Sequence, residues 1–155
     1  MRFVRSSKAT SVFYVGKREK QLLFQLLKLY PLVPSDHHQL SRSDASKTNA
    51  ESQRLIEEAL SEQRRDNKRV VNGLLNDPGR FVENGSGYHF SLTASEREWL
   101  LEILNDIRVG SWVKLGSPDT IMEFAEPADR ENLDFWAMEL AGFFQMALLR
   151  SLDTN

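Results

Sequence analysis

Apolar and polar positions repeat one pattern twice along the chain, at an offset of 77 residues. Around Phe13 and again around Phe90, apolar residues first alternate with polar ones and then recur at the spacing of an amphipathic helix. Each copy therefore predicts a strand that runs directly into a helix. A duplicated unit and chance patterning both remain open, because strand–helix pairs are common. If the units are real, we expect both strands in one sheet and both phenylalanines in similar environments.

The whole pattern predicts two β-hairpins and four main helices. The hairpins are expected at 2–5 with 10–15 and at 81–83 with 88–92, the second around a glycine-rich turn. The helices are expected at 17–29, 50–76, 94–115 and 130–151, with a short helix at about 118–124.

Capping residues support several of these helix boundaries. Thr93 and Glu96 form a capping box, which predicts a helix start at about residue 94, and Gly116 suits its end. Asn49 is a candidate cap for the second helix, and Pro31 is expected to stop the first.

The long second helix has a heptad-like seam that polar residues interrupt. Its apolar positions alternate in fours and threes, as in a coiled coil, but two amides stand in the middle. The seam consists of Ile56, Leu60, Gln63, Asn67, Val70 and Leu74.

The last helix is apolar around most of its circumference. A helix of this kind is buried at the centre of a fold or lies in an oligomer interface. We therefore expect it to be the central helix and to contribute to a homodimer interface. Its candidate interface residues are Phe143, Phe144 and Met146.

These elements predict one mostly helical α+β domain over residues 1–155, with two small hairpins that can pair into one minor sheet. A chain of 155 residues with 41% hydrophobic residues is long enough to bury one core. Residues 31–49 are rich in Ser, Asp and Pro without a period, so we expect a flexible loop there.

Composition excludes several classes of chemistry. The chain has no cysteine, which excludes disulfides, thiolate nucleophiles and iron–sulfur clusters. The sequence shows neither a signal-peptide core nor an apolar run that could span a bilayer, so we expect a cytoplasmic protein. No familiar catalytic or nucleotide-binding motif occurs. We accordingly predict no catalytic residues, no cofactor and no metal site.

Charge is distributed unevenly along the chain. Residues 1–30 carry seven basic side chains against a single acid, whereas residues 81–155 carry five basic and thirteen acidic ones. This asymmetry could form a face for polyanions, or the two ends could lie against each other or against a second subunit. We favour contact of the ends with each other or with a second subunit, because a negative half repels phosphate.

One basic stripe on the second helix is a candidate contact surface. Its charges could track phosphates, but acids interleave with them and no aromatic residues accompany them for base stacking. A solvated or partner-facing stripe is therefore favoured over a nucleic-acid site. The stripe consists of Arg64, Arg65, Lys68 and Arg69.

Two further polar groups have weaker implications. Asp36, His37 and His38 could contact a divalent ion, although too few ligands converge to favour a site over a solvated loop. On the third helix, Glu98, Glu102 and Asp106 share a face, which an exposed acidic stripe explains better than acid–base chemistry.

The polar residues Asn105, Asp106 and Arg108 interrupt the most hydrophobic helix. They could bind a ligand or tie down a neighbouring backbone, and the structural role is favoured.

Residues 90–108, from Phe90 through Thr93, Glu96 and Trp99 to Arg108, resemble a family of small bacterial helical proteins whose activity is not established. The opening Arg2-Phe3-x-Arg5 and the helix at 140–152 are also similar, whereas residues 109–116 depart from the family pattern. The resemblance implies a helical fold and a link to proteolysis or its regulation.

The functional prediction is a non-enzymatic interaction or regulatory protein that forms a homodimer. A nucleic-acid-binding regulator is the first alternative, and an enzyme with an unrecognised site is the second.

Overall fold

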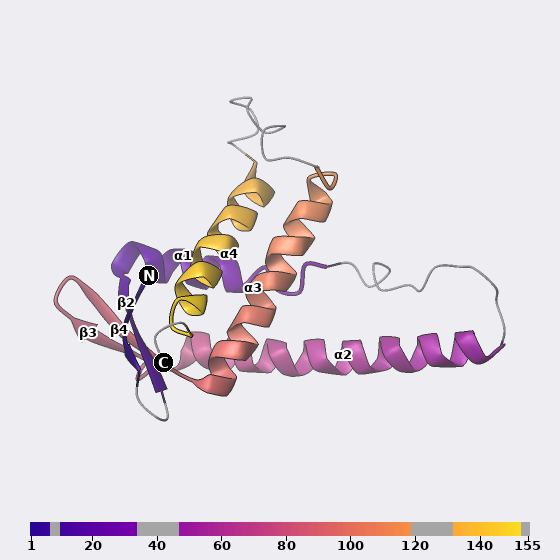
Figure 1. Ribbon diagram of the computed structural model, residues 1–155, viewed down its shortest axis with the longest axis horizontal. Coiled ribbons are helices and arrows are strands. Elements are labelled where there is room, and N and C mark those ends of the chain that lie inside the picture. The colour runs from indigo at the N-terminus through magenta and orange to yellow at the C-terminus, as the bar shows by residue number, and fades with distance from the viewer. Residues whose placement is uncertain (7–9, 34–46, 119–131, 153–155) are drawn as a thin grey trace.

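The computed structural model describes residues 1–6, 10–33, 47–118 and 132–152. Within these ranges the chain forms a small sheet and four helices, and the longest helix extends away from the others (Figure 1). The elements are β1 (Arg2–Ser6), β2 (Thr10–Gly16), α1 (Lys17–Leu27), α2 (Lys47–Asn76), β3 (Phe81–Asn84), β4 (Gly87–Thr93), α3 (Ala94–Lys114) and α4 (Leu133–Leu149).

The two hairpins form one four-stranded antiparallel sheet in the order β1-β2-β4-β3. The inner strands β2 and β4 join the hairpins, and Phe13 is the direct cross-strand partner of Phe90. The predicted mostly helical α+β fold is confirmed, and so is the pairing of both repeat strands in one sheet.

Both strand–helix units begin their helices in the same way. In the first, the Gly16 N–H donates to Glu19 Oε2 over 2.8 Å. In the second, the Thr93 N–H donates to Glu96 Oε2 over 2.9 Å, and Thr93 Oγ1 accepts from the Glu96 N–H over 3.2 Å. The capping box predicted for α3 is confirmed, and its acidic position recurs 77 residues earlier in α1.

Each of these glutamates also binds a cation that directly precedes the first strand of its hairpin. Glu19 accepts from the N-terminal ammonium of Met1, and Glu96 pairs with Arg80 Nη1 at 2.8 Å. Partial burial alone would raise the pKa of Glu19, but hydrogen bonds from the ammonium and the Gly16 N–H, with the charge of the ammonium, lower it. The two caps therefore tie hairpins to helices.

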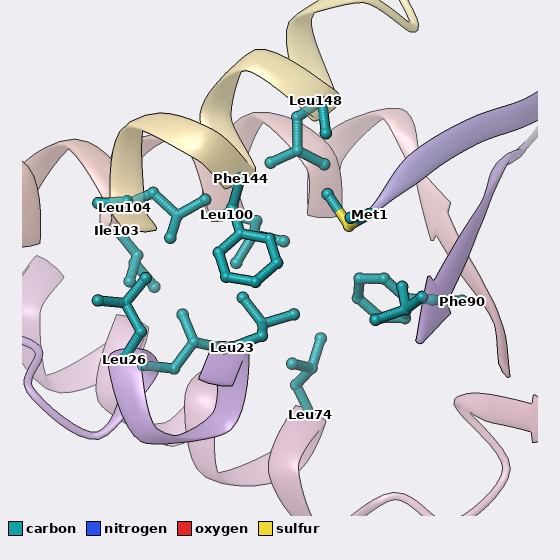
Figure 2. Close-up of a cluster of buried hydrophobic side chains, with 14 of the residues drawn as sticks. Met1, Leu23, Leu26, Leu74, Phe90, Leu100, Ile103, Leu104, Phe144 and Leu148 are labelled. Carbon is teal, nitrogen blue, oxygen red and sulfur yellow. The ribbon is translucent and has the colours of Figure 1, made fainter. Parts of the chain in front are cut away.

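The core lies between one face of the sheet and the helices (Figure 2). Phe13 and Phe90 come from the sheet, and α3 and α4 pack along each other with the most contacts of any helix pair. Fully or almost fully buried helix residues include Leu23 and Leu26 of α1, Leu100, Ile103 and Leu104 of α3, and Phe144 and Leu148 of α4.

Among its described side chains, α2 contributes Val71 and Leu74 to this core, near its C-terminal end, and Leu75 packs against it. Its N-terminal half, which we call the α2 arm (residues 47–63), extends away from α1, α3 and α4 in Figure 1. Along the arm, Leu55 and Ile56 are 57% and 40% exposed. The helix starts at Lys47, so Asn49 lies inside it and the predicted cap at Asn49 is wrong.

The flexible loop expected at 31–49 overlaps described structure at both of its ends. Residues 47–49 belong to α2, and the backbone N–H groups of residues 32 and 33 are hydrogen-bonded to α3. Residues 34–46, with His37 and His38, lie outside the described residues, as do residues 119–131 of the predicted short helix and its surroundings.

The two outer strands of the sheet differ from its inner strands. The register of β1 shifts between Phe3 and Arg5, where the strand is irregular, and Arg2 and Arg5 are exposed on it. At the other edge, β3 has four residues against the seven of β4.

Candidate functional site: the α2 junction and the α4 face

A polar contact region, which we call the α2 junction, joins α2 to α3 and to residues 30–33. Its centre is Asn67, whose Nδ2 donates to the Tyr30 hydroxyl over 3.1 Å. The Trp99 Nε1–H donates to Asn67 Oδ1 over 2.8 Å. Asn67 is one of the two amides that interrupt the predicted seam, and both ends of its partly buried amide have hydrogen-bond partners.

Asp106 of α3 holds the segment that follows Tyr30. Its Oδ1 accepts from the backbone N–H of Leu32 over 2.6 Å and of Val33 over 3.3 Å. Directly beside it, a Cβ placed on Gly110 would lie 2.6 Å from the backbone carbon of Leu32, so the segment passes where a side chain would otherwise stand. Asp106 therefore ties down a neighbouring backbone, the role favoured from the sequence.

The other polar residues of this part of α3 remain on the surface. Asn105 and Arg108 are exposed, and Glu98 and Glu102 are exposed as well. Because Asp106 is committed to backbone N–H groups, the three acids do not assemble into a pair for acid–base chemistry.

The environment of the α2 junction changes the pKa of the Tyr30 hydroxyl. Burial raises its pKa, and the negative charges of Asp106 and Glu102 raise it further. The hydrogen bond from Asn67 and the charge of Arg64 act in the opposite direction but do not cancel the rise. Tyr30 therefore stays a neutral hydroxyl over the physiological range.

The four residues of the basic stripe have different exposures and partners in the fold. Arg64 is half-buried and its Nη2 donates to the Val33 carbonyl over 2.9 Å. Arg69 is exposed and pairs with Asp66 at 3.2 Å. In the part of the chain that the structure describes, Arg65 and Lys68 make no ion pair.

Three stripe residues line one groove of about 280 Å³, which we call the Pro31 groove. Arg64, Arg65 and Lys68 supply its positive charge, and Pro31 and Leu60 supply apolar surface. Glu57 and Ser61 complete the lining. Positive side chains around an apolar floor suit an acidic, amphipathic segment of another protein.

A second exposed surface, the α4 face, runs along the side of α4 that points away from the core. It comprises Trp136, Glu139, Phe143, Met146 and Arg150, all exposed. Trp136, Phe143 and Met146 keep 49%, 47% and 55% of their surface exposed.

The structure separates the three candidate interface residues. Phe143 and Met146 belong to the α4 face, whereas Phe144 is fully buried in the core of its own chain. One side of α4 therefore lies in the core, and the opposite side is exposed.

Neither metal-binding nor membrane-spanning features occur among the described residues. No group of three His, Asp or Glu side chains there could hold a metal ion. No helix in those ranges combines the length and the apolar content that crossing a bilayer requires.

Comparisons with protein-family models, with curated proteins and with solved structures gave no match. The resemblance to a helical bacterial family stays a prediction.

Sequence reasoning missed Tyr30 and Trp99 as partners of Asn67, and it missed the Pro31 groove. The amides in the α2 seam were a visible signal that something polar meets this helix. The partners of Asn67 are 37 and 32 residues away along the chain, however, and only the fold brings them close to it.

Proposed function

We propose that this chain is a non-enzymatic, cytoplasmic interaction protein with a regulatory role, which works as a homodimer and binds a partner protein along α2. The observation that carries the proposal is the α2 arm, a helix segment that extends away from α1, α3 and α4 with the apolar residues Leu55 and Ile56 exposed.

The seam of α2 runs from the core into the arm. Leu74 is buried in the core, Asn67 is bonded in the α2 junction, and Ile56 is exposed on the arm. Most helical stability in proteins comes from packing of an amphipathic face. A partner helix laid along the arm would extend the core that Leu74 already belongs to.

The charges beside the seam indicate which kind of partner fits. The arm leads into the Pro31 groove, where Arg65 and Lys68 present positive charge without an ion pair in the described ranges. An acidic amphipathic helix would bury apolar side chains on Ile56 and Leu60 and place carboxylates at the groove. The resemblance to the helical family adds regulated proteolysis as the process in which such a partner would act.

The proposed homodimer uses the α4 face rather than the arm. Exposed apolar residues on α4 face away from the core, and closed two-fold pairing is the commonest way in which soluble chains cover such a surface. The two faces are separate, so self-association and partner binding can be tested independently.

Site-specific photo-crosslinking in the native cell tests the partner site. A photoreactive residue replaces Ile56 in one variant and Val82 of β3 in the control, since Val82 is an equally apolar, 61% exposed residue on another element. We expect one defined partner to crosslink at position 56 and not at position 82, and an added Leu60→Asp substitution to abolish the product.

Equal products at both positions, or none at position 56, would contradict the proposal. A product of twice the chain's own mass would show that the arm binds a second copy of this chain. The arm would then serve self-association, and the proposal of a different partner protein would be wrong.

A further inference from the structure

The residues of the α4 face follow a heptad spacing. Trp136, Glu139, Phe143, Met146 and Arg150 are separated by three, four, three and four residues, and all of them are exposed. Such spacing places side chains on one line along a helix, as at the contact positions of a coiled coil. The face thus has the geometry of a helix–helix contact, and its residues are exposed in the part of the chain that the structure describes.

The last four residues of this line are self-complementary about a point between residues 144 and 145. Phe143 and Met146 are equidistant from the point between Phe144 and Gln145, and so are Glu139 and Arg150. When two copies of the line run in opposite directions about this point, Phe143 is opposite Met146 and Glu139 is opposite Arg150. An apolar residue then faces an apolar residue, and an acid faces a base. This is the self-complementarity that a two-fold interface requires.

We infer that α4 pairs antiparallel with α4 of a second copy, about a two-fold axis between residues 144 and 145. Phe143 then packs on the partner's Met146, and Glu139 forms an ion pair with the partner's Arg150. By symmetry each contact occurs twice. This arrangement rests on the proposed self-association of the chain and specifies its geometry.

Charge selects the antiparallel arrangement over a parallel one. In a parallel pair in register, Glu139 would meet the same residue of the second copy, and Arg150 would do likewise, so that like charges would repel at both ends. In the antiparallel pair, two apolar layers of Phe and Met are flanked by two ion pairs. Aromatic rings also make favourable contacts with the thioether of Met.

Charge reversal tests this register in solution. We expect Glu139→Arg and Arg150→Glu each to raise the dimer dissociation constant about tenfold, measured by sedimentation equilibrium. The double variant carrying both substitutions should restore the wild-type constant, because each pair then contains opposite charges again. Glu98→Arg, an exposed acid of α3 outside the face, is the matched control and should leave the constant unchanged.

Cysteine crosslinking tests the apolar layers, and the absence of natural cysteine gives a clean background. Chains with Phe143→Cys mixed with chains with Met146→Cys should form a disulfide-linked heterodimer. Each variant alone should crosslink much less under the same mild oxidation. Efficient crosslinking of Phe143→Cys chains among themselves would show a parallel pair and overturn the inference.

The outcomes separate this inference from the proposed function. A dimer that persists while the double charge reversal fails to restore its affinity would overturn the register and leave self-association standing. A monomer at every concentration would overturn both the register and the dimer. Crosslinking of a partner at Ile56 would stand in either case.

Discussion

Phe13 and Phe90 lie directly opposite each other as cross-strand partners of β2 and β4, and both are fully buried. They are also the equivalent positions of the two copies of the sequence pattern, 77 residues apart. An approximate local two-fold axis that relates the two strand–helix units therefore passes between these two residues. The shared use of Glu19 and Glu96 in the helix caps extends the equivalence beyond the strands, which favours a duplicated unit over chance.

The close approach of residues 32 and 33 to α3 predicts that Gly110→Ala destabilises the protein. The added Cβ would lie 2.6 Å from the Leu32 backbone carbon and 2.8 Å from the Val33 nitrogen, so the backbone must shift. We expect a loss of about 1–3 kcal/mol in the free energy of unfolding, measured by urea denaturation.

A glycine in open space provides the control for that substitution. No atom of the described residues lies within 4 Å of a Cβ placed on Gly73, which is exposed on α2. Gly73→Ala should therefore stabilise the protein by about 0.5–1 kcal/mol through helix propensity. Equal effects of the two substitutions would show that the contact between residue 110 and Leu32 carries no strain.

The α2 junction predicts that Asn67→Ala costs about 1–3 kcal/mol of stability, because it leaves the Trp99 N–H and the Tyr30 hydroxyl without their partner. The matched control is Gln63→Ala, an exposed amide one step earlier in the same seam, which should change stability by less than about 0.5 kcal/mol. Thermal unfolding followed by circular dichroism measures both. A loss at Gln63 as large as at Asn67 would contradict the proposed junction.

Tyr30 predicts a stability change at alkaline pH. Because its pKa is raised in the folded state, the folded protein holds the phenolic proton more tightly than the unfolded chain does. The resulting stabilisation is fully present below pH of about 10 and is lost as the pH rises through the folded-state pKa. Urea denaturation across this range should show a decline that Tyr30→Phe reduces, and spectrophotometric titration should show the late-ionising phenol disappearing in that variant.

Alanine substitutions of the neighbouring residues Phe143 and Phe144 of α4 should have different effects on stability. Phe144→Ala removes a fully buried ring and should cost about 3–5 kcal/mol of monomer stability. Phe143→Ala removes a half-exposed ring and should cost less than about 1 kcal/mol in a denaturation experiment at low protein concentration, while weakening the dimer in sedimentation. An unfolded Phe143→Ala variant would place that ring in the core and count against the α4 face.

The divided basic stripe predicts weak binding to duplex DNA. Arg64 is bonded to a backbone carbonyl and Arg69 to Asp66, which leaves Arg65 and Lys68 to contact phosphates. Two phosphate contacts give a slope of about −2 in a plot of log affinity against log salt. Fluorescence anisotropy that shows tight binding near physiological salt, with a slope of about −4 or steeper, would favour the nucleic-acid-binding alternative instead.

Features set by local sequence could be predicted before the fold was known. The capping box of Thr93 and Glu96 depends on side chains three residues apart, and Gly116 has the positive φ of 86° expected at a helix end. The placement of the Phe13 and Phe90 strands in one sheet was expected from a repeated pattern that is itself local in each copy, whereas their direct pairing was not.

Features set by contacts between distant segments could not be predicted in this way. Helical periodicity places Phe143 and Phe144 on the same apolar helix, but only the packing of α4 on α3 decides which ring is covered. The role of Asp106 likewise depends on residues more than 70 positions away. Nothing local to its own helix indicates the backbone that it holds.

Both edges of the sheet have features that protect this protein from aggregation. Exposed strand edges with regular backbones can recruit strands from other chains into fibrils. Here the outer strand β1 is irregular between Phe3 and Arg5 and carries exposed arginines, and the opposite edge, β3, is only four residues long. Uncontrolled strand-to-strand growth is thereby disfavoured on both sides, so a concentrated solution of this protein should remain free of amyloid even though its helices present apolar surface.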